Sequence, residues 1–419
     1  MATLPIAQFV DGERLWQRHM ALARFGALAN GGVNRQALSE EEIAARAELV
    51  RWGRAIGLAP FTDAAGNLFL RLEGRDPSLP PVLVGSHIDS QPSGGKFDGV
   101  FGVLAALEVQ EAFRASGRTP LRAIETVAWM NEEGSRFAPG MMGSALYAGA
   151  RSVAEVLAVR DPAGESVETA LKALLARDVD VPHRALGRPA AAFLEAHIEQ
   201  GPVLELEGKT VGVVTGIQGK RTFRATVTGE ENHAGTAPRS VRRDALLAAA
   251  AMIGALDVAM RDAEDVTRFT VGRLEVTPNA PSVVAAKAVF SIDLRHPDAG
   301  TLQRLGDRIA DICRAQAGPC EVAVAQLLHD PPLSFPRDIR NILAKAAAAV
   351  GAPWMAIASG AGHDARYLHY FCPTGMIFVP CRNGISHNEA EWAEKDHLAA
   401  GARVLAEAAA VLASNGAPR

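Results

Sequence analysis

The chain has 419 residues, of which 48% are hydrophobic and 21% are charged, and its formal net charge is −4. This composition is typical of a soluble globular protein, and the length exceeds what one ordinary hydrophobic core supports, so we expect two domains. Lysine and arginine are scattered along the chain, which argues against an extended nucleic-acid-binding surface.

The amino terminus and the cysteines indicate a compartment. Residues 1–8 have no basic head followed by a long apolar run, so we expect no signal peptide. The longest apolar stretch, near 245–255, is too short to cross a bilayer. None of the cysteines has Cys-x-x-Cys spacing. They are Cys313, Cys320, Cys372 and Cys381. We therefore expect a cytoplasmic protein with reduced thiols.

The first 130 residues alternate between helix and strand patterns. Apolar spacing predicts a helix over 13–29, and Ser39 followed by Glu42 predicts the N-cap of a second helix that runs to about residue 56. The next segments are predicted in the order strand, strand, helix, strand: 67–72, 81–84, 100–115 and 122–130. This order predicts an α/β domain with a largely parallel central sheet and helices on both faces.

A glycine-rich loop follows the predicted strand at 81–84. It reads Gly85-Ser-His-Ile-Asp89 and continues as Gly94-Gly-Lys-Phe-Asp98-Gly. Its glycines allow a tight return of the backbone, so His87 and Asp98 can point into one crevice at the carboxyl end of the strand. Imidazole and carboxylate suit a divalent ion such as Zn²⁺. The alternative is a His–Asp pair that only holds the loop together.

Two adjacent glutamates, Glu132 and Glu133, stand where the strand at 122–130 ends. Such a pair followed by glycine is commonly a solvated turn. Beside a metal site, however, one carboxylate can be a ligand while its neighbour accepts a proton from the attacking water.

Residues 150–190 look helical and peripheral, and a weakly alternating strand from Phe193 then leads to His197 before Gly201-Pro202 ends it. A single histidine at the end of a strand is more often structural than a ligand. His197 therefore becomes a ligand candidate only together with the two motifs that precede it.

The middle of the chain has a different pattern. Strands and helices are predicted in the order β-α-β-β-α-β, at 219–229, 240–261, 268–277, 288–295, 301–316 and 321–325. This order predicts a ferredoxin-like α+β domain over residues 215–328, inserted into the first domain. Because the helix at 240–261 is rich in alanine, we expect it to pack closely against a second subunit. The inserted domain would therefore serve as a lid or dimerisation domain.

After the insertion the first domain resumes, so it comprises residues 1–214 and 329–419. We predict a helix at 337–350, a strand at 375–380 and a closing helix at 394–414. Between them lie two glycine-containing loops with histidines, which place His363 and His387.

Seven motifs now stand in one order along the chain. They are Gly85-Ser-His-Ile-Asp89, Gly94-Gly-Lys-Phe-Asp98-Gly, Glu132-Glu-Gly-Ser-Arg-Phe137, His197-Ile-Glu-Gln-Gly-Pro202, Asn232-His-Ala-Gly235, Ser359-Gly-Ala-Gly-His-Asp-Ala365 and Gly384-Ile-Ser-His387. With them the chain resembles, over about residues 10–392, the hydantoinase/carbamoylase branch of the M20 dinuclear metallopeptidase superfamily. That branch contains N-carbamoyl-L-amino-acid hydrolases, β-ureidopropionases and allantoate amidohydrolases.

The resemblance implies a centre with two divalent metal ions in each subunit, zinc first, with manganese, cobalt or nickel as alternatives. His87 and His197 would bind one ion, Glu133 and His387 the other, and Asp98 would bridge them. Glu132 would be the general base and then the general acid. Asp89 would orient His87 through a hydrogen bond, as metal-bound imidazoles usually require.

The resemblance also implies a set of substrate-binding residues, namely Gln200, His233, Asn279, Arg295 and His363. On chemical grounds Arg295 can hold a carboxylate with two parallel hydrogen bonds, and His233 can stabilise an oxyanion. Without the resemblance, Arg295 could equally be a surface arginine at a strand end. His233 and Asn279 lie in the inserted domain and would reach the site across a homodimer.

The implied reaction is hydrolysis of a linear C–N bond of an N-carbamoyl-L-amino acid or N-carbamoyl-β-alanine, with release of ammonia, CO₂ and the amino acid. Alternatives are an allantoate amidohydrolase, an aminoacylase or peptidase of the wider superfamily, and a non-catalytic metal-binding relative. A serine hydrolase using Ser359, His363 and Asp364 would lack the Gly-x-Ser-x-Gly elbow. A Cys381–His387 nucleophilic pair is a further alternative.

Three arginines depart from the family pattern or lie beside its motifs. Arg239 stands in Thr236-Ala-Pro-Arg239, where the family often has Thr-Thr-Pro-Met, and it could favour a more acidic substrate. Arg366 and Arg382 flank the two histidine loops near the end of the chain. Because of these arginines, the substrate side chain that the pocket accepts is not assigned. The predicted metal chemistry does not depend on them.

Overall fold

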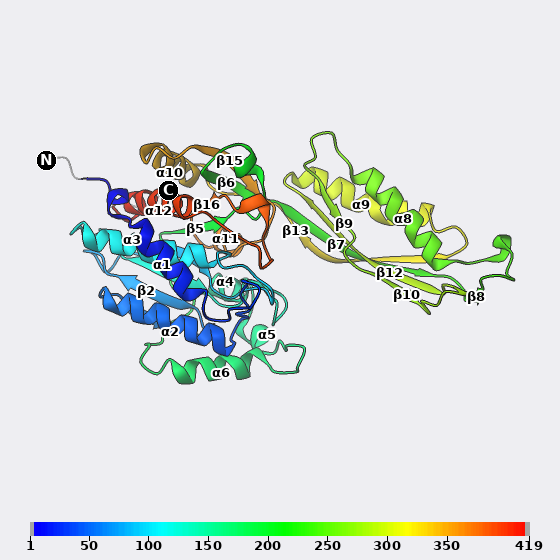
Figure 1. Ribbon diagram of the computed structural model, residues 1–419, viewed down its shortest axis with the longest axis horizontal. Helices are drawn as coiled ribbons and strands as arrows, with labels where there is room; N and C mark the ends of the chain where they lie inside the picture. The colour runs from blue at the N-terminus through cyan, green and yellow to red at the C-terminus, as the bar shows by residue number, and fades with distance from the viewer. Residues whose placement is uncertain (1–3, 415–419) are drawn as a thin grey trace. The chain divides into compact units, whose positions relative to one another are not determined.

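The computed structural model describes residues 4–414 and divides into two compact units (Figure 1). The first unit combines the chain up to Thr215 with the part from Phe335 onward, and the second is Gly216–Ser334. The role of the second unit as a lid or dimerisation layer remains a prediction, as do the domain limits proposed from the sequence.

The first unit is built on a mixed sheet in the order β1-β2-β4-β3-β5-β16-β6-β14, with β15 paired to β6. Its strands are β1 (Ala59–Thr62), β2 (Leu68–Leu72), β3 (Val82–His87), β4 (Ile124–Trp129), β5 (Ala192–Ile198), β6 (Val211–Ile217), β14 (Leu333–Ser334), β15 (Trp354–Ser359) and β16 (Thr374–Val379). The central run β4-β3-β5-β16 is parallel, and antiparallel strands flank it. The prediction of a largely parallel central sheet is therefore confirmed.

All residues of the four parallel strands are buried. A parallel strand covered on both faces reads as a continuous apolar run, as Val82-Leu-Val84 does, and does not alternate with polar residues. On one face a single apolar cluster joins the sheet to α2, α3, α10 and α12. On the other face Tyr147 of α4 packs against Phe69 and Trp129, with its ring centroid 5.1 Å from that of Trp129, and Trp129 in turn packs against Phe193.

The helices of the first unit differ in length and burial. They are α1 (Gly12–Leu22), α2 (Glu40–Ala55), α3 (Val100–Ala115), α4 (Met142–Tyr147), α5 (Val153–Leu157), α6 (Val167–Arg177), α7 (Val203–Leu206), α10 (Arg337–Ala349), α11 (Ala365–Leu368) and α12 (Lys395–Ser414), with 3-10 turns at Ile6–Phe9 and Arg382–Gly384. The first helix was predicted to reach residue 29 and is shorter, because the chain turns after Leu22 and passes through Gly26 at φ +82°. Ser39 caps α2 as predicted, accepting the Glu42 N–H at 3.2 Å.

Helix α12 is longer than the apolar stretch near 245–255 that the sequence singled out, although unlike that stretch it carries charged residues. Its length and composition are sufficient to cross a membrane, but 67% of the apolar window is buried inside the protein. Its residues Leu398, Val404, Leu405 and Leu412 belong to the same core cluster as α3. Packing against the rest of the unit therefore accounts for its apolar character.

The second unit contains an antiparallel sheet in the order β10-β12-β7-β13, with β9 also paired to β12. Its elements are β7 (Gly219–Thr228), β8 (Asn232–His233), a 3-10 turn (Arg239–Val241), α8 (Ala245–Met260), β9 (Arg268–Thr270), β10 (Leu274–Thr277), β11 (Val283–Val284), β12 (Lys287–His296), α9 (Ala299–Ala315) and β13 (Glu321–Asp330). The strand predicted over 268–277 is wrong as a single element, because the chain breaks between β9 and β10. Residues alternate along β7 between buried and more exposed, so one face packs on α8 and α9.

Candidate metal centre

The predicted ligands gather at the carboxyl ends of the four parallel strands, where open α/β sheets bind their ligands. His87 is the last residue of β3, and His197 is the next-to-last residue of β5. Glu133 follows β4, and His387 follows β16 after the 3-10 turn. Asp98 stands in the loop that leads from β3 into α3, next to Gly99 at the helix N-cap.

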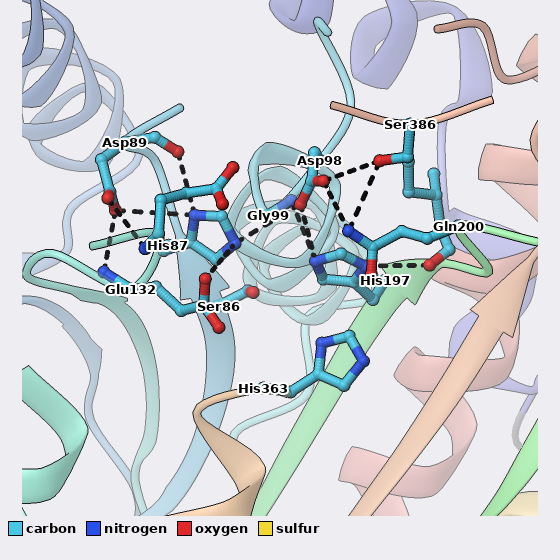
Figure 2. Close-up of polar contacts among 12 residues, drawn as sticks. Ser86, His87, Asp89, Asp98, Gly99, Glu132, His197, Gln200, His363 and Ser386 are labelled. Carbon is cyan, nitrogen blue, oxygen red and sulfur yellow. Dashed lines mark hydrogen bonds and ion pairs between the residues drawn. The ribbon is translucent and has the colours of Figure 1, made fainter. Parts of the chain in front are cut away.

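Asp98 lies at the centre of this cluster, between His87 on one side and Gln200 and Ser386 on the other (Figure 2). Its Oδ1 is 3.0 Å from His197 Nε2 and 3.5 Å from His87 Nε2. Its Oδ2 is 3.3 Å from His387 Nε2, which in turn is 3.4 Å from Glu133 Oε2. The two carboxylate oxygens of Asp98 thus face two different groups of donor atoms.

Each group is compact enough to surround one ion. The ligand atoms of His87, Asp98 and His197 lie within 4.8 Å of one another, and so do those of Asp98, Glu133 and His387. The sharing of Asp98 between the groups is the arrangement that a bridging carboxylate requires. The residues that the sequence proposed as ligands are therefore brought together by the fold.

The hydrogen bonds made by the Nδ1 atoms of His87 and His197 leave their Nε2 atoms available to bind a cation. His87 Nδ1 is 3.0 Å from the Asp89 carbonyl oxygen, and His197 Nδ1 is 2.9 Å from the Ile198 carbonyl oxygen. Because a carbonyl oxygen only accepts, each Nδ1 carries the hydrogen and each Nε2 offers a lone pair toward Asp98. Ring-nitrogen lone pairs that converge on a carboxylate suit a divalent cation.

Asp89 organises the loop around His87. Its Oδ1 is 3.5 Å from His87 Nδ1. The same carboxylate accepts hydrogen bonds from the backbone N–H groups of Glu132 at 3.2 Å and Glu133 at 3.1 Å. One fully buried side chain thus contacts His87, a predicted ligand, and holds the backbone of both glutamates in the loop after β4.

Gly99 allows the close packing at the centre. It has φ +65°, and a Cβ at this position would lie 2.3–2.4 Å from ring atoms of His87. Its N–H points at His197 Nε2, 3.2 Å away. No larger residue fits here, which explains the glycine after Asp98 in the motif.

The acidic groups give the site a negative potential. Burial lowers the pKa of His87, but the carboxylates of Glu132, Asp89 and Asp98 outweigh it and hold that pKa well above its ordinary value. Burial, together with the neighbouring Asp98, raises the pKa of Glu133 to about 7. Carboxyl groups buried together in this way favour an added positive charge, which a metal ion supplies.

Glu132 has the position of a base that is not a ligand. Its Oε2 is 3.6 Å from His87 Nε2, and its side chain is outside both groups of ligand atoms. Burial first, and then the charges of Asp364, Glu133 and Asp89, raise the pKa of Glu132 well above its ordinary value. A carboxyl group with a raised pKa beside a hydrolytic site is suited to accept a proton and return it.

Two of the predicted substrate residues lie in the same unit as the ligands. Gln200 has φ +57° and donates from Nε2 to Asp98 Oδ2 at 2.7 Å. The His363 ring lies against that of His197, with centroids 4.6 Å apart, and its Nε2 is 2.9 Å from Ser359 Oγ. Both side chains therefore border the ligand cluster, and their contact with a substrate remains a prediction.

The other three predicted substrate residues belong to the second unit. His233, in β8, is exposed and accepts the N–H groups of Gly235 and Thr236 at its Nδ1. Asn279 has φ +58° and follows the turn after β10. Arg295, near the end of β12, makes an ion pair with Asp293 at 2.8 Å. Their roles toward the metal centre remain predictions.

The geometry does not favour the two nucleophile alternatives. Asp364 is bonded to Ser144 and not to His363, so a Ser359–His363–Asp364 relay is not formed. The thiol of Cys381 is buried and lies 3.7 Å from the Gly201 carbonyl oxygen, and burial raises its pKa to about 12. A thiol with such a pKa is not a nucleophile at neutral pH.

Three side chains that support the ligands were not predicted from the sequence. Gln91 donates from Nε2 to Glu133 Oε2 at 2.7 Å. Ser386 Oγ lies 2.9 Å from Asp98 Oδ2, and Glu391 accepts the backbone N–H groups of Phe97 and Asp98. Of these, only Ser386 lies inside one of the motifs.

The parallel sheet, the two groups of potential metal ligands at its carboxyl edge and the adjacent glutamate are typical of a metal-dependent hydrolase. The comparisons with known proteins agree with this class. The model of Peptidase family M20/M25/M40 matches residues 83–411, and the chain belongs to this metal-dependent family.

Similarity extends over nearly the whole chain. The chain is 37% identical over 401 residues to the N-carbamoyl-L-amino-acid amidohydrolase of Rhizobium meliloti, and the alignment covers 94% of this chain and 95% of that protein. It is 35% identical to the allantoate amidohydrolase of Escherichia coli, covering 92% and 94%. A solved amidase of the hydantoinase/carbamoylase family from Burkholderia multivorans superposes with a TM-score of 0.91 at 42% identity, covering 97% and 98%. The predicted resemblance is confirmed.

Proposed function

We propose that the protein is a dinuclear metal-dependent amidohydrolase that cleaves the linear C–N bond of an N-carbamoyl-L-amino acid or N-carbamoyl-β-alanine. The single observation that carries the proposal is the pair of ligand groups that share Asp98, with Glu132 beside them. His87 and His197 would hold one ion, and Glu133 and His387 the other. Zinc is the first choice of metal, with manganese, cobalt or nickel as alternatives.

The residues of the chain divide the work of the reaction between them. Divalent ions bound at such a site supply hydroxide near neutral pH and polarise the scissile carbonyl group. Glu132 accepts the proton from the attacking water and returns it to the leaving nitrogen, which as an anion would be a poor leaving group. Asp89 keeps the backbone of Glu132 in place through the 3.2 Å hydrogen bond. Loss of ammonia leaves a carbamate, which releases CO₂ and the amino acid.

Substrate recognition is assigned to residues of both units. Arg295 would bind the substrate carboxylate with two parallel hydrogen bonds, and Asp293, 2.8 Å from its Nε, holds the guanidinium in orientation. His233 would stabilise the oxyanion, and Asn279, Gln200 and His363 would contact the ureido and amino-acid parts. The names of the amidohydrolase relatives support an N-carbamoyl substrate.

A screen for ammonia release tests the proposed function. The purified enzyme is supplied with Mn²⁺, Zn²⁺ or Co²⁺ and offered N-carbamoyl-L-amino acids, N-carbamoyl-β-alanine, allantoate and N-acetyl amino acids. We expect release of ammonia from the N-carbamoyl compounds, loss of activity after treatment with a chelator and recovery when the metal is restored. Full activity after the chelator treatment would contradict the metal mechanism, and hydrolysis of the N-acetyl compounds alone would indicate an aminoacylase.

Allantoate is the second candidate substrate. It also carries ureido groups and a carboxylate, so the same ligands and the same base serve its hydrolysis. The similarity to the Escherichia coli allantoate amidohydrolase over 92% of the chain supports this alternative. The same screen distinguishes the two candidates. Allantoate would be identified as the substrate if its kcat/KM were at least about tenfold above that of every N-carbamoyl amino acid, which corresponds to about 1.4 kcal/mol in transition-state stabilisation.

We also propose that the protein acts in the cytoplasm as a homodimer formed through the second unit. Helix α8 is apolar on most of its surface, and Leu247 and Val258 are 56% and 68% exposed. Exposed apolar side chains on one helix are typical of a subunit interface. Sedimentation velocity of the wild type and of a Leu247→Glu/Val258→Glu double variant tests this, with a shift of the variant to monomer expected.

A further inference from the structure

Glu391 is a buried carboxylate beside the metal ligands that has no part in the reaction described above. It is only 2% exposed and lies four residues after His387, between the 3-10 turn and α12. A fully buried acid requires hydrogen-bond partners or it is costly to keep. Its partners therefore indicate why it is there.

Those partners belong to the loop that carries Asp98, 293 residues earlier in the sequence. Glu391 Oε1 accepts the backbone N–H of Phe97 at 2.9 Å and that of Asp98 at 3.0 Å. Gly95 provides the space, since a Cβ there would lie 2.0 Å from Glu391 Oε1. One oxygen thus fixes the backbone of the residue whose side chain is shared between the two ligand groups.

The second oxygen of Glu391 reaches the Asp98 side chain through a serine. Ser386 Oγ lies 3.0 Å from Glu391 Oε2 and 2.9 Å from Asp98 Oδ2. Asp98 Oδ2 is the oxygen that faces His387. Ser386, next to His387 in the sequence, therefore couples the rotation of the Asp98 carboxylate to Glu391.

A separate apolar contact joins the same two segments. The ring of Trp392, adjacent to Glu391, packs edge-on against Phe97 with centroids 5.6 Å apart, and Trp16 packs against both rings. The Asp98 loop and the His387 segment are thus held together even without the carboxylate. A variant of Glu391 can for this reason keep its fold while it loses the polar contacts.

We propose that Glu391 is a positioning residue for the dinuclear centre. Through two backbone hydrogen bonds and the Ser386 link, it sets the orientation in which Asp98 presents one oxygen to each ligand group. The inference rests on the metal centre of the proposed function, and it adds a residue outside the ligand set that determines how tightly the ions are held.

The test measures binding of Mn²⁺ alone, without substrate, by isothermal titration of chelator-stripped full-length protein. Glu391→Ala removes all three contacts, and we expect Mn²⁺ binding to weaken about 10–100-fold, as is usual when a residue that supports a metal ligand is lost. Glu391→Gln keeps the carbonyl oxygen for both N–H groups and offers an amide hydrogen to Ser386, so it should rescue binding to within about threefold, since the orienting hydrogen bonds remain. Glu394→Ala, which breaks an exposed ion pair with Arg382 in the same segment, is the matched control and should bind as the wild type does.

The possible outcomes separate a positioning role from a purely structural one. If Glu391→Ala melts at a lower temperature but binds Mn²⁺ as tightly as the wild type, or if Glu391→Gln binds as weakly as Glu391→Ala, the inference is overturned. Should Glu391→Ala fail to fold, Ser386→Ala removes the link between Glu391 and Asp98 Oδ2, together with a long 3.4 Å contact from Gln200 Nε2, and leaves both backbone hydrogen bonds of Glu391 in place. It should still weaken Mn²⁺ binding by at least about threefold, because the carboxylate loses an orienting donor, and unchanged binding would overturn the proposal.

The same measurement keeps this inference separate from the proposed function. A wild-type protein that binds Mn²⁺ tightly but releases ammonia from no ureido compound would refute the function and leave the role of Glu391 intact. An active wild type whose Glu391→Ala variant binds Mn²⁺ equally well would refute the positioning role alone.

Discussion

Asp89 accepts a hydrogen bond from the backbone N–H of Glu133 at 3.1 Å, although the two residues belong to loops after different strands. It also accepts the N–H of Glu132, and its Oδ1 is 3.5 Å from His87 Nδ1. Its carboxylate therefore connects His87, at the end of β3, to Glu132 and Glu133 in the loop after β4. We therefore expect the geometry of the proposed metal centre to depend on this connection.

The first prediction concerns removal of this connection. Asp89→Ala should weaken Mn²⁺ binding by about 10–100-fold, because His87 loses the neighbouring Oδ1 carboxylate oxygen and Glu133 loses the hydrogen bond to its backbone N–H. Turnover should fall with it, since Glu132 loses the same support. Titration with Mn²⁺ and assay at saturating Mn²⁺ measure the two effects. An Asp89→Ala protein with wild-type affinity and wild-type kcat would show that the connection is dispensable.

The second prediction uses the close packing of Gly99. Gly99→Ala should abolish metal binding and activity, because its Cβ would lie 2.3 Å from the His87 ring. Gly117→Ala is the matched control, since Gly117 has a similar φ of +68° but no heavy atom within 4 Å of an added Cβ. The control should lose only about 1–2 kcal/mol of stability from the left-handed backbone. Metal content by mass spectrometry and thermal unfolding distinguish the two variants.

A third prediction separates the two adjacent glutamates. Glu132→Gln should keep its metal ions and lose about 10²–10⁴-fold in kcat, because an amide cannot carry the proton. Glu133→Gln should instead lose metal, since its carboxylate belongs to a ligand group. The measurement is metal content beside single-turnover kinetics. Loss of metal from Glu132→Gln would mean that the two roles are exchanged.

The loop that brings His87 and Asp98 together, and the helix after it, could be predicted from the sequence because their signals are local. The glycine-rich loop after an apolar strand placed His87 and Asp98 together, and α3 spans Val100–Ala115 as predicted. His197 alone read as a structural histidine at a strand end and became a ligand candidate through the resemblance, and the parallel pairing of β3 and β5 brings it to the same edge of the sheet. His387 was placed by the motif resemblance, since no spacing rule connects it to β3.

What could not be predicted depends on contacts between distant segments. Glu391 stands in an acidic stretch that reads as a solvated surface, and only the fold shows that it enters the Asp98 loop. The apolar pattern of α12 equally does not distinguish a core helix from a membrane span, because both bury apolar residues on most sides. The sequence has no strong turn signal at 271–273, where the chain breaks between β9 and β10. Gly272 is the one turn-forming residue there, and a single glycine is equally compatible with a bulge inside a continuous strand.

A fourth prediction tests the carboxylate role proposed for Arg295. Arg295→Lys should raise KM for carboxylate-bearing substrates by about tenfold or more, because an ammonium group cannot make two parallel hydrogen bonds. Arg268 lies opposite Arg295 in the neighbouring strand and contacts Asp265, so Arg268→Lys is the control and should leave KM unchanged. Steady-state kinetics at saturating metal gives both values. An unchanged KM in Arg295→Lys would exclude the clamp.

The fifth prediction is a pH dependence of stability from His19, which lies on α1 outside the metal centre. The residue is fully buried, its ring lies 5.4 Å from that of Phe97, and burial lowers its pKa to about 3. The unfolded chain takes up the proton near pH 6.5 whereas the folded chain does not until about pH 3, so the unfolded state binds more protons between these values. The contribution of His19 to the free energy of unfolding is therefore fully present above pH 6.5. Between pH 6.5 and about pH 3 it falls as the pH decreases, by up to about 1.4 kcal/mol per pH unit.

His19→Leu removes this titration and should make the free energy of unfolding less dependent on pH below 6.5. Urea unfolding at pH 8, 6 and 5 measures the difference between wild type and variant, in which the contributions of all other groups cancel. His183→Leu, at an exposed histidine, is the control and should keep the wild-type slope. If His19→Leu and the wild type lose stability in parallel as the pH falls, His19 is protonated in the folded protein and the aromatic cluster around it must accommodate the charge.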